Sequence, residues 1–235
     1  MIQIQHVHKR FGKITVLNNV NLSLKGGQCI ALIGPNGSGK TTLIKTILGM
    51  VVPQSGKILF KEKDTAHKWE YRKEIGYMPQ IGRYPENMTV GQVLDMMKDI
   101  RKMSEHELDT DLVTAFQIAQ IMDKRMRTLS GGTRQKVSAC LAFIFNPSVL
   151  ILDEPTAGLD PLSTEILKEK IRAEKQKDKL IIITSHVLSE LDDLVSEVIY
   201  MQDGKPRFHE TLDTLKASTG TDRLSKAIAH VMSHQ

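Results

Sequence analysis

Residues 34–42 read Gly34-Pro35-Asn36-Gly37-Ser38-Gly39-Lys40-Thr41-Thr42, and the rest of the chain is organised around this stretch. An apolar run at residues 29–33 precedes it, and residues 43–48 follow it with the spacing of a helix. A strand, a glycine-rich loop and a helix in this order are the context in which the pattern G-x-x-x-x-G-K-[ST] marks a phosphate-binding loop. The alternative is a glycine-rich turn that binds nothing, and the presence of both flanks disfavours it. We expect these nine residues to bind the phosphates of a nucleoside triphosphate.

Each residue type in this loop has a chemical reason. The glycines at 34, 37 and 39 permit backbone angles that a Cβ atom disfavours, so successive N–H groups can point at one anion. The helix that follows adds the positive end of its dipole at the same place. Lys40 is expected to reach the β- and γ-phosphates, and the hydroxyl of Thr41 is expected to hold Mg²⁺. The sequence thus predicts ATP and Mg²⁺ as the bound groups.

A second motif carries two carboxylates at the end of an apolar strand, where residues 149–152 lead into Asp153 and Glu154. A buried parallel strand delivers its last side chains to the carboxyl edge of the sheet, where ligands bind in such folds. We expect Asp153 to meet the Mg²⁺ that Thr41 holds. Glu154 is placed to orient or deprotonate the attacking water, which is worth about 10²–10⁴ in rate. The motif is weak evidence alone and strong evidence beside a phosphate loop.

The pattern along the chain predicts an α/β fold. Strand-like stretches at residues 2–8, 16–24, 57–60 and 75–78 indicate a strand-rich early part, with an antiparallel layer against the nucleotide-binding core. Apolar residues then recur at three- and four-residue intervals from about 90 to 146, which indicates an inserted helical subdomain. Strands at 149–152 and 180–184, with a helix at 161–175 between them, indicate a parallel sheet covered on both faces.

The composition of the chain is that of a soluble globular protein, with 235 residues, 40% apolar and 25% charged. Its apolar runs, such as residues 149–152 and 180–183, are far shorter than the roughly 18 residues of a membrane span, and residues 1–5 lack the features of a signal peptide. Cys29 and Cys140 have neither metal nor disulfide spacing, which fits a reducing cytoplasm.

The net charge of +5 is compatible with a nucleic-acid partner or an anionic membrane surface, but the distribution of the charges leads us to expect no nucleic acid. The densest basic stretch, residues 168–179, is interrupted by acidic residues at helical spacing, and we expect a solvated helix face there. His230 and His234 form an i, i+4 pair close to the C-terminus, which we interpret as solvated and not as a metal site.

A third motif, Leu129-Ser130-Gly131-Gly132-Thr133-Arg134-Gln135, opens a helix with Ser130 as the expected N-cap. It is a second anion-binding helix N-terminus, which a single nucleotide at residues 34–42 does not need. With this motif upstream of the Asp-Glu strand, the sequence closely resembles the ATP-binding subunit of an ABC transporter. The resemblance runs from residue 2 to about residue 204, and its motifs are specific in combination. It implies one ABC-type ATPase domain over residues 1–235, with a strand-rich and P-loop core at 1–80 and 147–205, a helical subdomain at 81–146 and a short tail at 206–235.

The resemblance also implies roles for individual residues. Gln80 matches the glutamine loop that touches Mg²⁺ and water and senses the membrane partner, and His186 matches the switch histidine at the γ-phosphate. Asp160, in Ala157-Gly158-Leu159-Asp160, matches the D-loop at a dimer interface. In the family two subunits pair head to tail, so residues 130–132 and Gln135 of one subunit belong to a loop that seals ATP on the phosphate loop of the other. The chain departs from the family at one position. The family usually has Tyr where the side chain stacks on adenine, and here the residue is Phe11. Stacking of an aromatic ring on a base contributes about 1–3 kcal/mol of binding free energy and does not need the hydroxyl.

Three classes of function follow from this pattern. The first is ATP binding and hydrolysis in a homodimer that drives transport by a separate integral membrane subunit, which would keep the chain on the cytoplasmic face of the membrane. The second is a soluble ABC ATPase that acts on ribosomes or DNA, but the expected double module, coiled-coil insertion and zinc insert are absent. The third is a binding module with a dead site, which the complete catalytic set disfavours. Residues 212–228 resemble the short ending of exporter-type subunits, and residues 81–88 are expected to expose Tyr84 and Met88 to the membrane partner.

Overall fold

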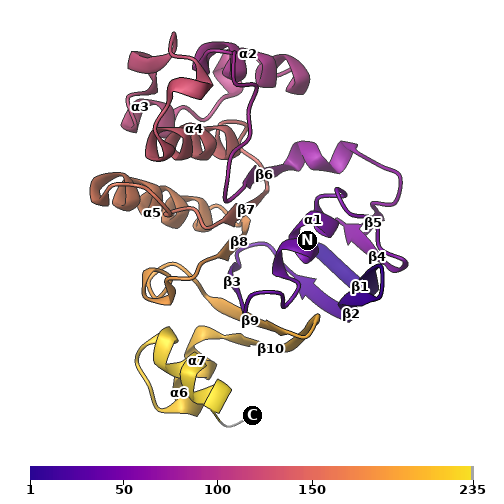
Figure 1. Ribbon diagram of the computed structural model, residues 1–235. Coiled ribbons are helices and arrows are strands. Elements are labelled where there is room, and N and C mark those ends of the chain that lie inside the picture. The colour runs from indigo at the N-terminus through magenta and orange to yellow at the C-terminus, as the bar shows by residue number, and fades with distance from the viewer. Residues whose placement is uncertain (234–235) are drawn as a thin grey trace.

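The computed structural model describes residues 1–233, so His234 lies outside the described residues. Two sheets lie at the centre of this part of the chain, and helices pack around them (Figure 1). The larger sheet has six strands in the order β10-β9-β3-β8-β7-β6, and the smaller sheet has four in the order β2-β1-β4-β5. The predicted α/β fold, with a parallel sheet beside an antiparallel layer, is confirmed.

The parallel part of the larger sheet has short and mostly apolar strands, as burial on both faces requires. It consists of β3 (Cys29–Ile33), β6 (Ile75–Met78), β7 (Val149–Asp153), β8 (Leu180–Thr184) and β9 (Glu197–Gln202), and β10 (Lys205–Thr211) is added antiparallel at the edge. Because side chains alternate along a strand, Leu150 and Leu152 face one hydrophobic core while Val149 and Ile151 face the other. The segment predicted as a tail from residue 206 therefore begins inside this sheet.

The smaller sheet covers one face of the larger one together with α1 (Lys40–Ile47). Its strands are β1 (Ile2–Phe11), β2 (Ile14–Leu24), β4 (Ser55–Phe60) and β5 (Lys63–Asp64). β1 extends beyond the predicted strand at residues 2–8, because Arg10 and Phe11 still pair with β2. A bulge at His6, with φ of 52°, breaks the alternation of β1 and turns Val7 into the core.

The inserted region is helical, as predicted, although short turns interrupt it. It contains α2 (Val90–Arg101), α3 (Asp111–Ala115) and α4 (Gly131–Phe143), joined by the single-turn helices η2 (Glu105–Glu107), η3 (Ile118–Ile121) and η4 (Met126–Thr128). Single turns also occur at η1 (Glu70–Glu74) and η5 (Leu188–Glu190). On the second face of the larger sheet, α4 packs together with α5 (Pro161–Lys175), and α6 (Leu212–Thr219) and α7 (Leu224–Ser233) form a pair at the opposite end of the molecule (Figure 1). Within residues 1–233, no helix combines the length and the apolar character needed to cross a bilayer.

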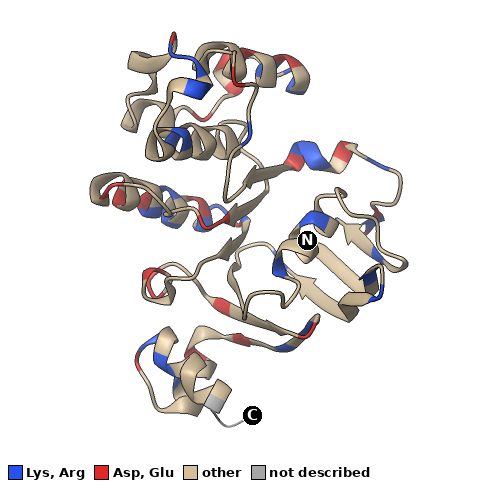
Figure 2. Ribbon diagram, viewed as in Figure 1, with Lys and Arg blue, Asp and Glu red and all other residues tan. Residues whose placement is uncertain are grey.

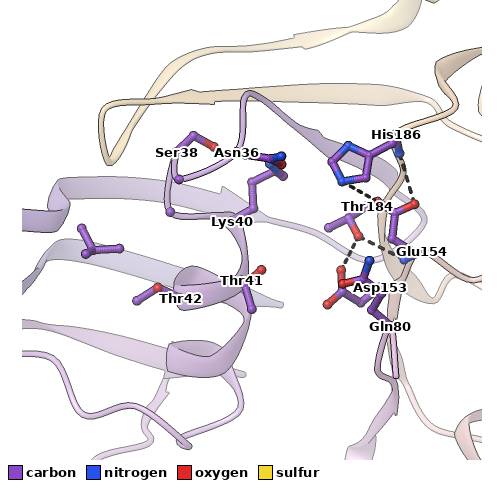
Figure 3. Close-up of a pocket in the computed structure, with 13 residues that line it drawn as sticks. Asn36, Ser38, Lys40, Thr41, Thr42, Gln80, Asp153, Glu154, Thr184 and His186 are labelled. Atoms are coloured by element: carbon purple, nitrogen blue, oxygen red, sulfur yellow. Dashed lines mark hydrogen bonds and ion pairs between the residues drawn. The ribbon is translucent and has the colours of Figure 1, made fainter. Parts of the chain in front are cut away.

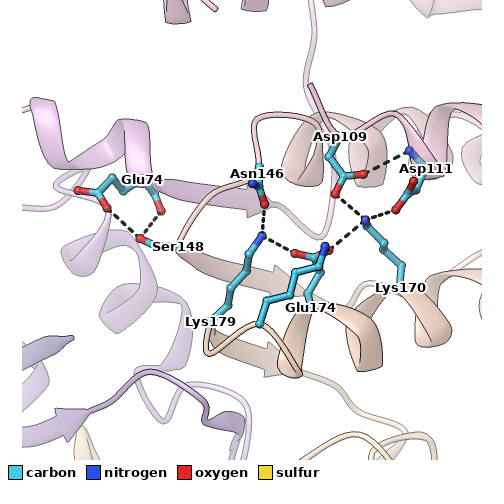
Figure 4. Close-up of polar contacts among 9 residues, drawn as sticks. Glu74, Asp109, Asp111, Asn146, Ser148, Lys170, Glu174 and Lys179 are labelled. Carbon is cyan, nitrogen blue, oxygen red and sulfur yellow. Dashed lines mark hydrogen bonds and ion pairs between the residues drawn. The ribbon is translucent and has the colours of Figure 1, made fainter. Parts of the chain in front are cut away.

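The expected solvated face at residues 168–179 is wrong in its most basic part. Positive and negative side chains do alternate on α5 (Figure 2), but Lys170, Glu174 and Lys179 are buried, at 6%, 1% and 7% exposure. Lys170 Nζ donates to Asp109 Oδ2 at 2.5 Å and to Asp111 Oδ2 at 2.7 Å, and Glu174 accepts from Lys170 and Lys179 (Figure 4). Asp109 and Asp111 lie about sixty residues before Lys170, in the helical region. The charge pattern of residues 168–179 alone therefore does not reveal these ion pairs. The network joins the helical region to the core.

Candidate active site

The glycines of the phosphate loop are required by its geometry. Gly34 and Gly39 have φ of 144° and 102°, in the region that favours glycine. A Cβ atom on Gly34 would lie 2.0 Å from Met201 O, and one on Gly39 would lie 2.6 Å from Val16 O. Gly39 is also the N-cap of α1 and offers no side-chain acceptor, so the first N–H groups of the helix stay available at the loop. The loop therefore forms a cradle that a side chain would fill.

Two side chains of the loop, Lys40 and Ser38, are placed to bind an anion. Lys40 Nζ donates to the loop's own carbonyl oxygens, at 2.7 Å to Gly34 O and 3.1 Å to Pro35 O. Burial lowers the pKa of Lys40, and the carboxylates of Glu154 and Asp153 oppose that shift. Ser38 Oγ is buried and has no hydrogen-bond partner among the described residues, which fits a phosphate oxygen in the cradle.

The two carboxylates stand at the carboxyl edge of the sheet, as predicted. Asp153 ends β7 and pairs in register with Thr184 of β8, whose hydroxyl donates to Asp153 Oδ1 at 2.5 Å. Glu154 has φ of 53°, a left-handed conformation that a non-glycine residue seldom adopts. Its N–H donates to Thr184 O at 3.1 Å and lies 3.2 Å from Thr184 Oγ1. Both carboxylates are nearly buried, at 9% exposure each.

His186 follows β8 and contacts Glu154 twice. Its N–H donates to Glu154 Oε2 at 3.2 Å, and its Nε2 lies 3.5 Å from Glu154 Oε1 (Figure 3). The carboxylate is thus held from the side of β8 while it faces the phosphate loop. Gln80 comes two residues after β6, the strand that pairs with β7, and reaches the same edge.

The loop and the sheet edge enclose one cavity of about 210 Å³. Eleven of the predicted residues line it: Asn36, Gly37, Ser38, Gly39, Lys40, Thr41, Thr42, Gln80, Asp153, Glu154 and His186. Val16 and Thr184 line it as well and were not predicted. Thr184 could have been found, since it ends the strand next to the Asp-Glu strand. A larger cavity of about 450 Å³ lies beside the end of α1 and β4, but its lining contains neither the phosphate loop nor the carboxylate pair.

The oxygen donors of this cavity suit Mg²⁺. Thr41, Gln80 and Asp153 offer a hydroxyl, an amide and a carboxylate, the hard ligands that Mg²⁺ prefers. Residues 1–233 contain no group of three His, Cys, Asp or Glu side chains able to hold a metal ion. A site with one carboxylate is nevertheless typical where substrate phosphates supply further ligands.

Several predicted residues lie outside the cavity. Phe11, at the end of β1, is 50% exposed, and Lys9 Nζ lies 5.1 Å from its ring centroid. Ser130 caps α4, as predicted, and accepts from Thr133 N at 3.2 Å, while Gly131 and Gly132 continue the exposed end of that helix. Asp160 caps α5, and the ammonium of Lys136 together with Ser163 holds the pKa of Asp160 well below its usual range.

Gln135 differs from the expectation that it belongs to a loop serving another subunit. Its side chain is 6% exposed, and its Nε2 donates to Glu154 O of the same chain at 3.2 Å. The reason is the period of α4, which turns position 135 inward when Ser130 is at the exposed N-cap.

Tyr84 and Met88 are also less exposed than predicted. Both are partly buried against the core, and Tyr84 Oη donates to Ser138 Oγ at 3.0 Å. Burial raises the pKa of Tyr84, and the hydrogen bond to Ser138 opposes that shift. Ile81, at 67% exposure, is the outward apolar side chain of this segment.

The fold and this site are those of an ATPase with a phosphate loop, and comparison with known proteins gives the family. Residues 17–157 match the family described as ABC transporter. The lantibiotic transport ATP-binding protein SrtF of Streptococcus pyogenes is 33% identical over 87% of this chain and 88% of its own length. The Nod factor export ATP-binding protein I of Ralstonia nicotianae is 31% identical over 87% of this chain, which spans 65% of that relative.

Solved structures agree with the sequence matches. An ATP-binding subunit of an ABC transporter has a TM-score of 0.91 with 27% identity, over 99% of both chains. A dimeric bacterial ABC transporter cassette has the same fold, with a TM-score of 0.79 over 90% of this chain and 99% of its own at 24% identity. The chain belongs to the ABC transporter family. It is an ATP-binding ATPase, and the resemblance seen in its motifs is confirmed.

Proposed function

We propose that two copies of this chain pair head to tail on ATP and that hydrolysis of ATP drives transport by a separate integral membrane subunit. The observation that carries the proposal is the carboxylate of Glu154, which is held by His186 and faces the phosphate loop across one cavity. The names of the relatives, which describe export and transport ATP-binding proteins, support the transport role.

Binding of ATP uses the loop and its flanks. The N–H groups of residues 36–39 and of the start of α1 surround the phosphates, and the hydroxyl of Ser38, which has no partner among the described residues, donates to one of their oxygens. Lys40 exchanges the carbonyl oxygens of Gly34 and Pro35 for the β- and γ-phosphates. Phe11 stacks on the adenine.

Thr41, Gln80 and Asp153 would hold Mg²⁺, and Thr42 lines the cavity beside them. The ion, when bound, neutralises charge on the phosphates. Thr184 keeps the carboxylate of Asp153 in place, because its hydroxyl donates to Oδ1.

Glu154 acts as the general base that takes a proton from the attacking water. His186 holds the carboxylate in orientation through its N–H and its imidazole, and the imidazole also reaches the γ-phosphate. Gln80 lines the same cavity, where its amide would contact the attacking water and Mg²⁺.

The second half of each site comes from the partner subunit. Ser130, Gly131 and Gly132 do not line this chain's own cavity, although they present the N-terminus of α4 to the outside. In a head-to-tail pair each such loop seals the nucleotide of the other copy, and the D-loop around Asp160 lies at the interface. Leu162, 72% exposed at the start of α5, is buried by the same pairing.

The helical region docks the membrane subunit. A cavity of about 340 Å³ lies beside the segment after Gln80, lined by Ile81, Gly82, Arg83, Tyr84, Glu86, Met126 and Arg134. A short helix of the membrane subunit docks here, with the exposed Ile81 as an apolar contact. This assembly places the chain on the cytoplasmic face of the membrane, and the division into a core, a helical subdomain at 81–146 and a C-terminal tail belongs to the same proposal.

ATP turnover by the purified chain tests the site. Lys40→Ala should abolish ATP binding and turnover, whereas Lys45→Ala, an exposed lysine of α1, should leave both unchanged. Chelation of Mg²⁺ should stop turnover of the wild type. A Lys40→Ala chain that binds ATP as tightly as the Lys45→Ala control would contradict the assigned site.

A further inference from the structure

The start of α4 packs against the turn that follows β7. The contacts come from Gly132, Gln135 and Lys136, whose i, i+3, i+4 spacing places them on one face of the helix. A Cβ atom on Gly132 would lie 2.7 Å from Gly158 O, so the two backbones approach more closely than a larger residue allows. One helix face thus contacts both ends of the segment from residue 154 to residue 160.

Gln135 reaches the first residue of that segment. Its Nε2 donates to Glu154 O at 3.2 Å, and Pro155 O lies 3.5 Å away. Glu154 adopts a left-handed φ of 53°, a conformation that persists only where its surroundings hold it. Thr184 bonds the Glu154 N–H, and Ala157 N and Gln135 Nε2 bond its carbonyl oxygen. Among these hydrogen bonds to the backbone of Glu154, the one from Gln135 comes from a helix, whereas the others come from the sheet and the turn.

Lys136 reaches the last residue of the segment. Its Nζ lies 2.8 Å from Asp160 Oδ2, and the other carboxylate oxygen of Asp160 caps α5 through Ser163 N at 2.9 Å. Asp160 is half-exposed while Lys136 is one-quarter exposed, so the pair lies at the rim of the contact. The far end of the turn is therefore fixed to both α4 and α5.

We propose that Gln135 and Lys136 are positioning residues that hold the turn at residues 154–160 and so aim the carboxylate of Glu154 at the phosphate loop. This inference rests on the proposed function, in which Glu154 is the base. The N-terminus of α4, which serves the partner's nucleotide, and Glu154, which serves this chain's own nucleotide, belong to one packed unit. A partner that docks on the N-terminus of α4 therefore acts on the same unit that holds Glu154.

Turnover of Gln135→Met in the full chain tests the inference. The substitution keeps side-chain length and removes the amide donor. We expect kcat to fall about 10- to 100-fold, because a base displaced by about an ångström loses that much. The KM for ATP should stay within about twofold, since Gln135 touches no nucleotide. Gln120→Met, an exposed glutamine on η3, is the matched control and should change neither constant.

A double variant separates positioning from general damage to the fold. If Gln135 acts through Glu154, adding Gln135→Met to Glu154→Gln should lower the residual kcat by less than about twofold. A full additional loss on that background would overturn the inference, as would a Gln135→Met chain with wild-type kcat.

Lys136 provides a second test. Its side chain is more exposed than that of Gln135, so its replacement disturbs the packing of the core less. Lys136→Met should lower kcat, and Lys136→Arg, which keeps a cation that can bond Asp160, should restore it to within about twofold of wild type. Equal activity of Lys136→Met and wild type would remove Lys136 from the inference. Failure of the proposed function has a different signature, because a Glu154→Gln chain with normal turnover would contradict the base itself, whatever the Gln135 and Lys136 variants do.

Discussion

The N–H of His186 and its Nε2 both approach the carboxylate of Glu154, at 3.2 Å from Oε2 and 3.5 Å from Oε1. The two residues follow adjacent parallel strands, β7 and β8, so the sheet itself sets their separation. A base anchored this way needs no rearrangement of the chain to face the phosphate loop, which is pre-organisation in structural terms.

Replacement of His186 by alanine should lower kcat about 10²-fold, because the carboxylate loses its orienting imidazole and the γ-phosphate loses a contact. The backbone N–H that also bonds Glu154 remains, so ATP affinity should change little. Steady-state turnover with Val187→Ala as the exposed neighbouring control checks this. Equal turnover in the His186→Ala and Val187→Ala chains would show that the imidazole has no part in the reaction.

Ser130→Arg should block hydrolysis and leave the affinity of the isolated monomer for ATP unchanged, because Ser130 lies away from its own chain's cavity. Mixing Ser130→Arg subunits with Lys40→Ala subunits should restore part of the turnover, since such a pair keeps one intact composite site. A monomer affinity that falls as far with Ser130→Arg as with Lys40→Ala would disprove the arrangement in trans.

Ile81→Glu should leave the ATPase activity of the isolated chain unchanged and prevent its co-purification with the membrane subunit. Ile81 is 67% exposed beside the cavity of the helical region, and a carboxylate there opposes an apolar contact. Met232→Glu, at an exposed methionine of α7, is the matched control, and it should co-purify at wild-type yield. Recovery of the Ile81→Glu chain at that same yield would remove the segment after Gln80 from the docking surface. Tyr84 is unsuitable for this test, because its partly buried hydroxyl bonds Ser138.

Glu174→Gln should lower the free energy of unfolding by about 3–5 kcal/mol, since it leaves buried lysines without their counter-charge. Glu169→Gln, on the exposed face of the same helix, should change it little. Denaturant unfolding of the two variants at neutral pH checks the difference. Equal stability of the two chains would show that the network does not stabilise the fold.

The same network predicts a pH dependence. Burial alone would raise the pKa of Glu174, but hydrogen bonds from Lys177, Lys179 and Lys170 outweigh it and lower the pKa to about 2. Because this value is below that of the unfolded chain, about 4.3, the stabilisation is present above about pH 5 and is lost as the pH falls toward 2. Wild-type stability should therefore fall across this range by more than that of Glu174→Gln.

Much of this fold could be predicted from the sequence, because its strands are short, apolar and bounded by turns. The helix at Pro161–Lys175 and the strand at Leu180–Thr184 were expected at those bounds, since an Asp-Pro start and a continuous apolar run are local signals. The phosphate loop and the Asp-Glu strand likewise carry their chemistry in adjacent residues.

What could not be predicted depends on contacts between distant segments. The sequence around Lys170 predicts a surface residue, but Lys170 is buried because it pairs with Asp109 and Asp111. Likewise Tyr84 is predicted to be exposed, but its hydroxyl bonds Ser138, which lies 54 residues later in the chain. Gln135 is different, because its buried position could be predicted from the sequence. The helical period counted from the N-cap Ser130 places Gln135 on the inward face of α4.

The central claim is that Glu154 is the base of a site that two copies of the chain close on ATP. Its most direct test is the Glu154→Gln chain, with Glu165→Gln, at an exposed position on α5, as the control. We predict at least about 10²-fold slower turnover with ATP binding intact, and a particle of twice the monomer mass in ATP that reverts to the monomer without it. Turnover within about threefold of wild type, where loss of a base should cost 10²-fold or more, would contradict the account.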